Sequence, residues 1–247
     1  MQTPIIKGYF SDSRIRINHK HYIFVLALRK FNIQLMMKQK IFEYYIKSVL
    51  ENDKEPNSVY RFCKDLKIKE SEFYKHFASI DHLKSQIFLQ FYNNTNSLIQ
   101  KEKGYISKSP KEKLLSFYFT FFEVLLLNRS YVLFALQGGK NSLDKMVALK
   151  SLKLVFKKFA ADLIQDGNDL KKSLINKRPE GIFSEGAWIQ LMFLLKFWMD
   201  DVSPDFEKTD IAIEKSIRTV FDLFDSSPFD SVIDFGKFLW KEKFSII

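Results

Sequence analysis

The scarcity of helix-breaking residues constrains this chain more than any other feature. Its 247 residues include only 8 glycines and 6 prolines, which favours long helices over a turn-rich sheet protein. Apolar residues also recur at helical spacing, as in the stripe Ile213, Ile217, Val220, Phe221 and Phe224. The sequence contains no convincing strand pattern. It therefore predicts an all-α protein that is large enough to bury a sizeable core.

Helices are expected in series from residue 39 onward. The predicted segments are Gln39–Asn52, Ser58–Leu66, Ser71–Phe77, Ser79–Lys103, Leu114–Leu127, Tyr131–Gln137, Ser142–Ile164, Ser184–Asp200, Pro204–Asp225 and an amphipathic tail, Phe229–Phe244. Ser58 and Ser79 are suited to accept hydrogen bonds from the first free N–H groups of a helix. Pro110 suits a first helical turn, whereas Gly167 is expected to end a helix.

Residues 1–36 do not resemble the rest of the chain. A short apolar patch, His21–Leu28, lies among basic residues. A signal peptide is one interpretation, but Arg29 and Lys30 follow the patch at once. A basic arm that contacts DNA is a second interpretation. A misassigned start, with Met36 or Met37 as the true first residue, is the interpretation we favour, because the helical pattern begins directly after Met37.

Charge and cysteine content limit the function classes. The net charge of +10 makes nucleic acid or an anionic membrane surface a candidate partner. Residues 38–103, however, hold twelve basic and nine acidic residues, so the bulk charge says little about DNA. The single cysteine, Cys63, excludes an intrachain disulfide and a multi-cysteine zinc site, and fits a reducing cytoplasm. No apolar run reaches the ~18 residues of a membrane-spanning helix.

The sequence offers no basis for catalysis. His76 and His82 lie close together, but no carboxylate cluster completes a metal site. We find no glycine loop that would cradle a phosphate and no Ser-His-Asp arrangement. We therefore expect a cytoplasmic protein that is not an enzyme and needs no cofactor.

The most informative segment is Ser58–Leu83, SVYRFCKDLKIKESEFYKHFASIDHL. The first helix of the segment has its apolar residues on one face, and a second apolar group follows a tight turn. These residues are Val59, Phe62, Cys63 and Leu66, then Phe73, Tyr74 and Phe77. This spacing predicts two short helices that cross over a small core, a unit that can present its second helix to the major groove of DNA.

This segment resembles the helix-turn-helix module of TetR-like bacterial transcriptional regulators. The matching residues are Phe62-Cys63, Tyr74-Lys75-His76-Phe77, Ser79 and Asp81-His82-Leu83. The resemblance implies a DNA-binding domain over residues 37–83, an effector-binding and dimerisation domain over 84–227 and an amphipathic helix over 228–247. The protein would bind operator DNA as a homodimer, with residues 184–200 and 204–225 of each protomer forming a four-helix bundle.

The resemblance also implies which residues contact DNA. Tyr74 would donate its hydroxyl to a phosphate, and Ser58 would help to bind another at a helix start. The remaining candidates, near base edges or backbone, are Lys69, Ser71, Glu72, Lys75 and His76.

Some positions depart from the family pattern. Lys67 replaces the usual turn glycine, which requires a left-handed conformation. Glu70 and Glu72 oppose a polyanion, and Ile80 replaces a phosphate-binding lysine. A degenerate module that does not bind DNA is therefore an alternative.

A small hydrophobic or lipid effector would act by changing the spacing of the two DNA-reading helices, provided that it distinguishes two states. Candidate residues for its pocket are Phe117, Phe121, Glu123, Tyr131, Phe134, Trp188, Met192 and Trp198. The alternative is that these aromatic residues form ordinary core, and that Glu123 lies on a solvated stripe.

The segment WMDDVSPDFEKTD, Trp198–Asp210, resembles the end of the mitochondrial lipid-binding accessory proteins of ubiquinone biosynthesis, which share the TetR-like fold. This resemblance implies a second hypothesis: a lipid-binding accessory protein with little or no DNA binding. Phe238, Leu239 and Trp240 of the tail would then contact a membrane surface. A plain helix start, with a serine cap, a proline and acidic residues, explains the same motif.

Overall fold

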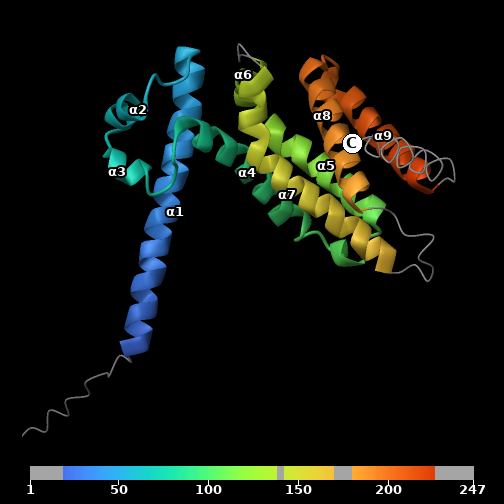
Figure 1. Ribbon diagram of the computed structural model, residues 1–247, viewed down its shortest axis with the longest axis horizontal. Coiled ribbons are helices and arrows are strands. Elements are labelled where there is room, and N and C mark those ends of the chain that lie inside the picture. The colour runs from blue at the N-terminus through green and yellow to red at the C-terminus, as the bar shows by residue number, and fades with distance from the viewer. Residues whose placement is uncertain (1–18, 138–141, 170–179, 226–247) are drawn as a thin grey trace, which may run out of the picture. The chain divides into compact units, whose positions relative to one another are not determined.

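The computed structural model describes residues 19–137, 142–169 and 180–225, and all the regular structure in these ranges is helical (Figure 1). The helices are α1 His19–Asn52, α2 Val59–Leu66, α3 Glu70–Phe73, α4 Ile80–Ile99, α5 Pro110–Leu126, α6 Arg129–Gln137, α7 Ser142–Asp169, α8 Glu180–Asp200 and α9 Glu207–Asp225, with short 3-10 turns η1 Tyr105–Ser107 and η3 Pro204–Phe206. The all-α expectation is confirmed. The predicted tail, with Phe238, Leu239 and Trp240, lies outside the described residues.

Contacts divide the chain into two units, residues 1–45 and 46–247. In the first unit, α1 begins at His19, about twenty residues before the predicted start at Gln39. No glycine or proline occurs between residues 19 and 52, so nothing in the sequence interrupts the helix. The expectation that helical structure begins after Met37 is therefore wrong. Every residue from Leu26 to Met36 is exposed, including Phe31 and Ile33.

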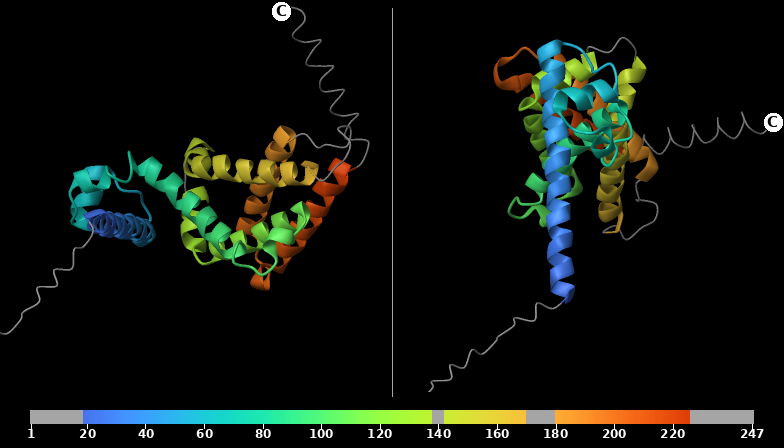
Figure 2. Two further views of the ribbon diagram at one scale, coloured as in Figure 1. Left: turned by 90° about the horizontal axis from the view of Figure 1, so that it is seen from below. Right: turned by 90° about the vertical axis from the view of Figure 1, so that its left-hand side faces the viewer.

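In the second unit, α4, α5, α7, α8 and α9 pack together as a bundle (Figures 1 and 2). Helix α7 contacts both α4 and α8, and α5 contacts α4, α7 and α9. Phe117 of α5 lies in the core, where its ring stacks on Phe121 at 5.4 Å and meets Phe159 of α7 at 4.9 Å between centroids. Aromatic burial of this kind is the main force that holds the helices together.

Local signals set several helix starts as expected. Ser79 accepts a hydrogen bond from the backbone N–H of His82 at the start of α4. At α5, Ser109 and Glu112 form a reciprocal capping box with Pro110 in the first turn. Each arrangement satisfies N–H groups that would otherwise lack a partner.

Other helix ends differ from the prediction. Helix α7 continues through Gly167 to Asp169, because one glycine weakens a helix by only about 1 kcal/mol relative to alanine. Pro204 opens η3 and not α9, because Asp205 and Phe206 adopt positive φ angles of 49° and 59°. Helix α9 therefore begins at Glu207.

Within the described residues, no single helix is long and apolar enough to cross a membrane; α5 and α6 meet that test of length and composition only as a pair, which bends by 92°.

Polar contacts secure the C-terminal end of α8. The guanidinium of Arg129 donates to the carbonyls of Trp198 and Met199 at 3.0 and 3.1 Å, and lies 4.4 Å from the centroid of the Trp198 ring. Three residues after Trp198, the Asp201 carboxylate accepts hydrogen bonds from the N–H and hydroxyl groups of both Ser203 and Thr209. Burial acts to raise the pKa of Asp201, but these four donors outweigh it and lower the pKa to about 2.

Candidate functional site

Helices α2 and α3 cross over an aromatic core. The Phe73 ring lies 5.8 Å from Phe62 and 5.6 Å from Phe77 between centroids, and all three side chains are buried. Cys63 is buried beside them, and burial together with Glu70 raises the pKa of its thiol. The thiol therefore stays protonated near neutral pH and acts as a small packing group. The small core predicted for the segment Ser58–Leu83 is confirmed, except that Tyr74, which was grouped with its apolar residues, is exposed.

A left-handed residue makes the turn between the two helices. Lys67 has φ 59° and ψ 44°, and the N–H of Ile68 donates to the carbonyl of Cys63 at 3.0 Å. This pairing closes the end of α2 in the manner usual for a glycine. The left-handed conformation predicted for Lys67 is confirmed, and the lysine adopts it without the freedom of a glycine.

The start of α2 is capped by Ser58. Its hydroxyl accepts from the N–H of Arg61 at 3.1 Å, and its backbone is extended, as an N-cap requires. Ser58 is exposed, so the N–H groups of the first turn lie near solvent. The capping role is confirmed, whereas a phosphate contact at this position stays a prediction.

Helix α3 is shorter than the predicted segment Ser71–Phe77. It ends at Phe73, so three of the predicted DNA contacts, Tyr74, Lys75 and His76, lie in the turn that follows it. The N–H of His76 bonds to the Phe73 carbonyl three residues back, which tightens the chain and ends the regular helix. The predicted bounds of this helix are wrong, although its position is right.

Charges around α3 largely compensate one another. Lys75 forms an ion pair with Glu72 at 2.5 Å, and this hydrogen bond lowers the pKa of the Glu72 carboxyl. Tyr74 is 53% exposed, and Lys69 and Ser71 are also exposed, whereas His76 is half-buried. The segment Ser58–Leu83 holds five basic and four acidic residues, so its net charge gives little attraction to a polyanion.

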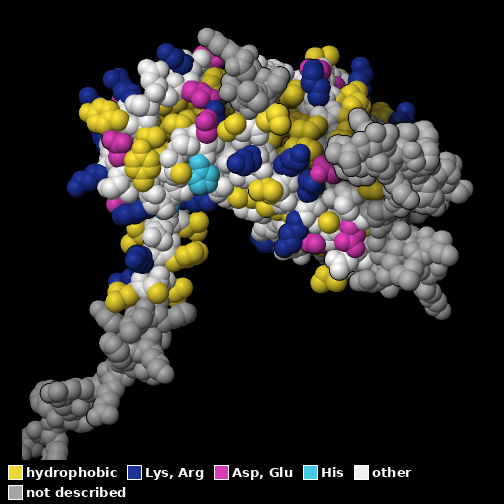
Figure 3. Space-filling view, in the orientation of Figure 1, with side chains coloured by type: hydrophobic (Ala, Val, Ile, Leu, Met, Phe, Trp, Pro, Cys, Tyr) yellow, Lys and Arg dark blue, Asp and Glu magenta, His cyan; other side chains and the backbone are white. Residues whose placement is uncertain are grey.

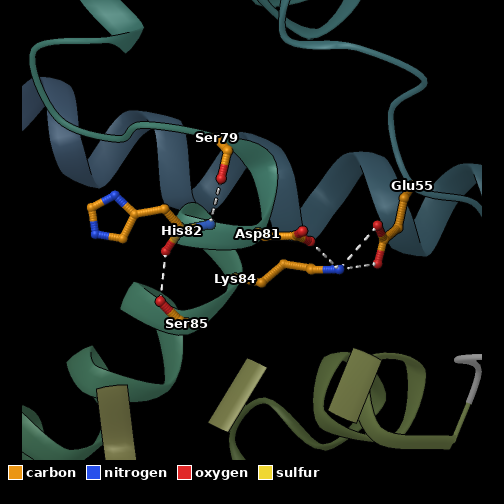
Figure 4. Close-up of polar contacts among 6 residues, drawn as sticks. All are labelled: Glu55, Ser79, Asp81, His82, Lys84 and Ser85. Atoms are coloured by element: carbon orange, nitrogen blue, oxygen red, sulfur yellow. Dashed lines mark hydrogen bonds and ion pairs between the residues drawn. The ribbon is translucent and has the colours of Figure 1, made fainter. Parts of the chain in front are cut away.

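An ion cluster around the buried Lys84, which the sequence did not predict, joins the loop after α1 to α4 (Figure 4). The Lys84 ammonium contacts Glu55 at 2.9 and 3.2 Å and Asp81 at 2.9 Å. Burial acts to lower the pKa of Lys84, but the two carboxylates outweigh it and raise the pKa. The i,i+3 spacing of Asp81 and Lys84 could have predicted their ion pair. The contact with Glu55 could not be predicted in this way, because Glu55 is remote in sequence.

Hydrogen bonds connect the same part of α4 to α7. Ser85 lies one residue after Lys84, and its hydroxyl accepts from Ser151 at 3.1 Å. Gln86 donates its amide to Ser151 at 3.3 Å. Residues next to the α2–α3 unit are thus bonded to the helix bundle through α4.

A cavity of about 330 Å³ opens among α6, α7 and α8. Its walls are Leu136, Met146, Leu149, Lys150, Lys153, Trp188, Met192, Leu195, Lys196 and Met199. Figure 3 shows hydrophobic and basic side chains lying side by side over α7 and α8. Two of the predicted pocket residues, Trp188 and Met192, therefore face a cavity.

The structure places the other predicted pocket residues elsewhere. Phe117, Phe121, Tyr131 and Trp198 are buried in the core and do not line the cavity. Phe134 lines a second, more open hollow of about 490 Å³ with Leu50 and Ser130, among others. Glu123 is exposed, which matches the solvated alternative. Aromatic rings from α7, such as Phe156 against Phe117 at 5.2 Å, fill the space that a ligand would need.

Across residues 19–137, 142–169 and 180–225, no group of three or more His, Cys, Asp or Glu side chains is placed to hold a metal ion.

Comparison with known structures supports the fold. A TetR-family transcriptional regulator from Syntrophomonas wolfei is similar, with a TM-score of 0.57 and 15% identity over 78% of this chain and 96% of that one. The fatty acid degradation regulator FadR from Bacillus halodurans gives 0.47 and 13% over 77% and 95%. A TetR-family regulator from Shewanella sp. PV-4 gives 0.44 and 16% over 76% and 96%. The first likeness shows a shared fold, and the other two carry no further argument.

Sequence comparison identifies the family. No curated protein matches the chain. The family model described as "Tetracyclin repressor-like, C-terminal domain" matches residues 113–239, which is more than half of the sequence. This match and the all-helical fold agree with the resemblance carried by residues 58–83, and the chain belongs to the TetR-like family.

Proposed function

We propose that this protein is a one-component transcriptional regulator that binds operator DNA as a dimer and responds to a small hydrophobic effector. The observation that carries the proposal is the α2–α3 unit. A capped α2, a left-handed turn at Lys67 and an aromatic core hold α3 in place, while Tyr74 stays 53% exposed. This arrangement suits a helix-turn-helix, which contacts phosphates and base edges from its second helix. The proposed function is binding, and no catalysed reaction is part of it.

The contacts proposed with DNA are those of the exposed groups. The Tyr74 hydroxyl donates to a phosphate, and Ser58 places the first turn of α2 near another. Lys69, Ser71 and Glu72 lie near base edges, where the Glu72 carboxylate can accept from cytosine. Lys75 must leave its ion pair with Glu72 to bind DNA, which lowers the expected affinity.

An exposed apolar stripe on α8 supports dimerisation. Ile182, Ile189, Phe193 and Phe197 recur at helical spacing and are 36–67% exposed. Gly186 lies within the stripe, and a side chain added there would meet nothing within 4 Å, so a second helix can approach closely. Apolar faces of this kind are typical of interfaces. We propose that α8 and α9 of two protomers form a four-helix bundle.

DNA binding is tested by a gel-shift titration of the dimer against its own upstream DNA at several salt concentrations. The Tyr74→Phe variant removes one hydroxyl and should weaken the shift about tenfold, since a hydrogen bond to a charged group contributes roughly 1.5 kcal/mol or more. Tyr105→Phe, in η1, makes the same chemical change outside the α2–α3 unit and should bind as wild type. A protein that gives no salt-sensitive, sequence-specific shift would contradict the proposal.

The ion pair between Lys75 and Glu72 favours a second candidate function. Because it compensates one of the few basic groups near α3, it lowers the expected affinity for DNA, which agrees with the alternative of a lipid-binding accessory protein that has little or no DNA binding. In that case the tail, including Phe238, Leu239 and Trp240, would contact a membrane surface. Flotation with liposomes should then separate the full chain from one truncated after Asp225. Equal flotation of the two proteins would exclude this role for the tail.

A further inference from the structure

The cavity among α6, α7 and α8 combines apolar walls with basic groups. Seven of its ten lining residues are apolar, three are lysines and none is acidic. Lys150 and Lys153 lie three residues apart on α7, and therefore project from one side of the helix. Lys196, on α8, is the third lysine and forms an ion pair with Asp200. Within the described residues, Lys150 and Lys153 form no such ion pair.

Two lysines thus bring positive charge to an apolar pocket. Glu185, which does not line the cavity, forms an ion pair with Lys157 and also interacts with the charge of Lys153. The ammonium of Lys153 lies 5.7 Å from the ring centroid of Trp188, over the pocket wall. Opposite charge and charge-assisted hydrogen bonds would stabilise an anion here, whereas a cation would be repelled. The electrostatics of the cavity therefore favour a ligand with an anionic head.

Methionines form much of the apolar wall. The chain has three methionines after residue 37, namely Met146, Met192 and Met199, and all three line this cavity. Methionine side chains are unbranched and adapt to irregular or flexible partners. They suit a flexible alkyl chain better than a rigid ring system, which precise packing would recognise.

We infer that this cavity binds a single-chain anionic amphiphile, whose head contacts Lys150 and Lys153 and whose alkyl chain lies along the methionines. The volume of about 330 Å³ is near the lower end of the range for small-molecule pockets, roughly 300–1,000 Å³. It fits one chain of medium length and excludes a two-chain lipid. The role of this ligand as effector rests on the proposed function, whereas its binding does not depend on DNA.

Titration of purified full-length protein with decanoate tests the inference. Calorimetry measures the binding, together with the intrinsic tryptophan fluorescence, to which Trp188 in the cavity wall contributes. Decanol and decyltrimethylammonium carry the same chain with a neutral and a cationic head, and monodecyl phosphate carries an alternative anion. Decanoate or decyl phosphate should bind at least tenfold more tightly than decanol, and the cation least. The stronger of the two anions identifies the head group. Equal binding of decanol and the anions would overturn the inference, as would absence of binding.

Variants separate the charge from the apolar wall. Lys150→Gln with Lys153→Gln should reduce anion affinity about tenfold and leave decanol unchanged. Lys111→Gln with Lys158→Gln removes the same charge from exposed positions outside the cavity and should have no effect. Met146→Trp fills the pocket from a side chain that is 67% exposed, so the fold should tolerate it, and all ligands should then bind weakly. Unchanged anion affinity in the first variant would overturn the assignment of the head.

The ligand assay and the gel shift test the two proposals independently, because either result can be negative while the other is positive. Amphiphile binding without a DNA shift would support the ligand class and contradict the regulator. A specific DNA shift by a protein that binds none of the probes would support the regulator and overturn the ligand class. If both hold, decanoate should change the DNA affinity of wild type but not of the Lys150→Gln, Lys153→Gln variant.

Discussion

The Lys84 ammonium lies 2.9 Å from a carboxylate oxygen of Glu55, although 29 residues separate the two in sequence. The lysine side chain is only 8% exposed, whereas Glu55 is 44% exposed. Asp81 supplies a second carboxylate from the first turn of α4. Because a buried charge without a partner is strongly unfavourable, the ammonium fixes the loop after α1 against the start of α4.

Loss of both carboxylates should destabilise the protein more than the sum of the single losses. We expect Glu55→Gln or Asp81→Asn alone to lower the free energy of unfolding by about 1 kcal/mol, because one partner remains. The double variant should lose roughly 3 kcal/mol or more, because the buried ammonium then has no partner. Urea unfolding of wild type, the two single variants and the double variant measures this difference as a double-mutant cycle. Glu51→Gln, from an exposed pair with Lys47, is the control and should change little. Strict additivity would contradict the shared role of the ammonium.

The same cluster predicts a pH dependence at the alkaline end. The pKa of Lys84 is raised above its ordinary value of 10.5, so the folded state holds this proton more tightly than the unfolded state. The stability that it contributes is fully present below pH 10.5 and is lost as the pH rises through the folded pKa. The difference in unfolding free energy between wild type and the Lys84→Met variant should therefore shrink above that pH. A constant difference would contradict the raised pKa.

At the acid end, Asp201 should govern part of the stability. Its pKa is lowered from 3.8 to about 2 by four hydrogen bonds that outweigh burial, so its contribution is present above pH 3.8 and is lost as the pH falls towards 2. Asp201→Asn should cost about 1–3 kcal/mol near neutral pH, because the amide nitrogen that replaces one carboxylate oxygen cannot accept, which leaves the donors of either Ser203 or Thr209 without their acceptor. In thermal melts, the difference in stability from wild type should narrow as the pH falls below 3.8 and close only below about pH 2. Asp222→Asn, on the exposed side of α9, should match wild type throughout.

Arg129 should not be replaceable by lysine. Its planar guanidinium donates to two carbonyls at the end of α8 and stacks near both Trp198 and Phe206. A lysine cannot reproduce this forked, stacked geometry, so Arg129→Lys should lower the free energy of unfolding by about 1–3 kcal/mol. Chemical denaturation measures the loss. The same change at Arg218, which is exposed on α9, should have almost no effect, and equal losses at the two sites would refute the argument.

The turn at Lys67 stores strain that a glycine would release. A left-handed conformation costs an L-residue about 1–2 kcal/mol, while glycine adds unfolded-state entropy of about 0.5–1 kcal/mol. Lys67→Gly should therefore raise the free energy of unfolding by roughly 0.5–1 kcal/mol. Lys69→Gly provides the matched comparison, because Lys69 is extended with φ −80° and gains nothing from glycine. It should destabilise the protein slightly, and stabilisation by both changes would contradict the explanation.

Features that depend on neighbouring residues were predictable from the sequence. Ser58, Ser79 and Pro110 mark helix starts because each acts on backbone groups within one turn. The left-handed conformation of Lys67 was implied by the family resemblance, because Lys67 stands where the family pattern has a turn glycine. A single helix-weakening residue was a less reliable indicator than a capping group. Gly167 does not end α7, because the helix on either side of it is stable enough to continue.

The sequence by itself determined the helical architecture, the α2–α3 unit and its aromatic core, because periodicity and capping act over a few residues. Only the tertiary structure decided which face of each helix meets another. It buried Phe117 and Phe121 in the core and left Trp188 and Met192 on a cavity. It also brought Glu55 to Lys84. Both outcomes depend on the packing of segments remote in sequence, where the filling of space and the pairing of buried charge are properties of the whole assembly of helices.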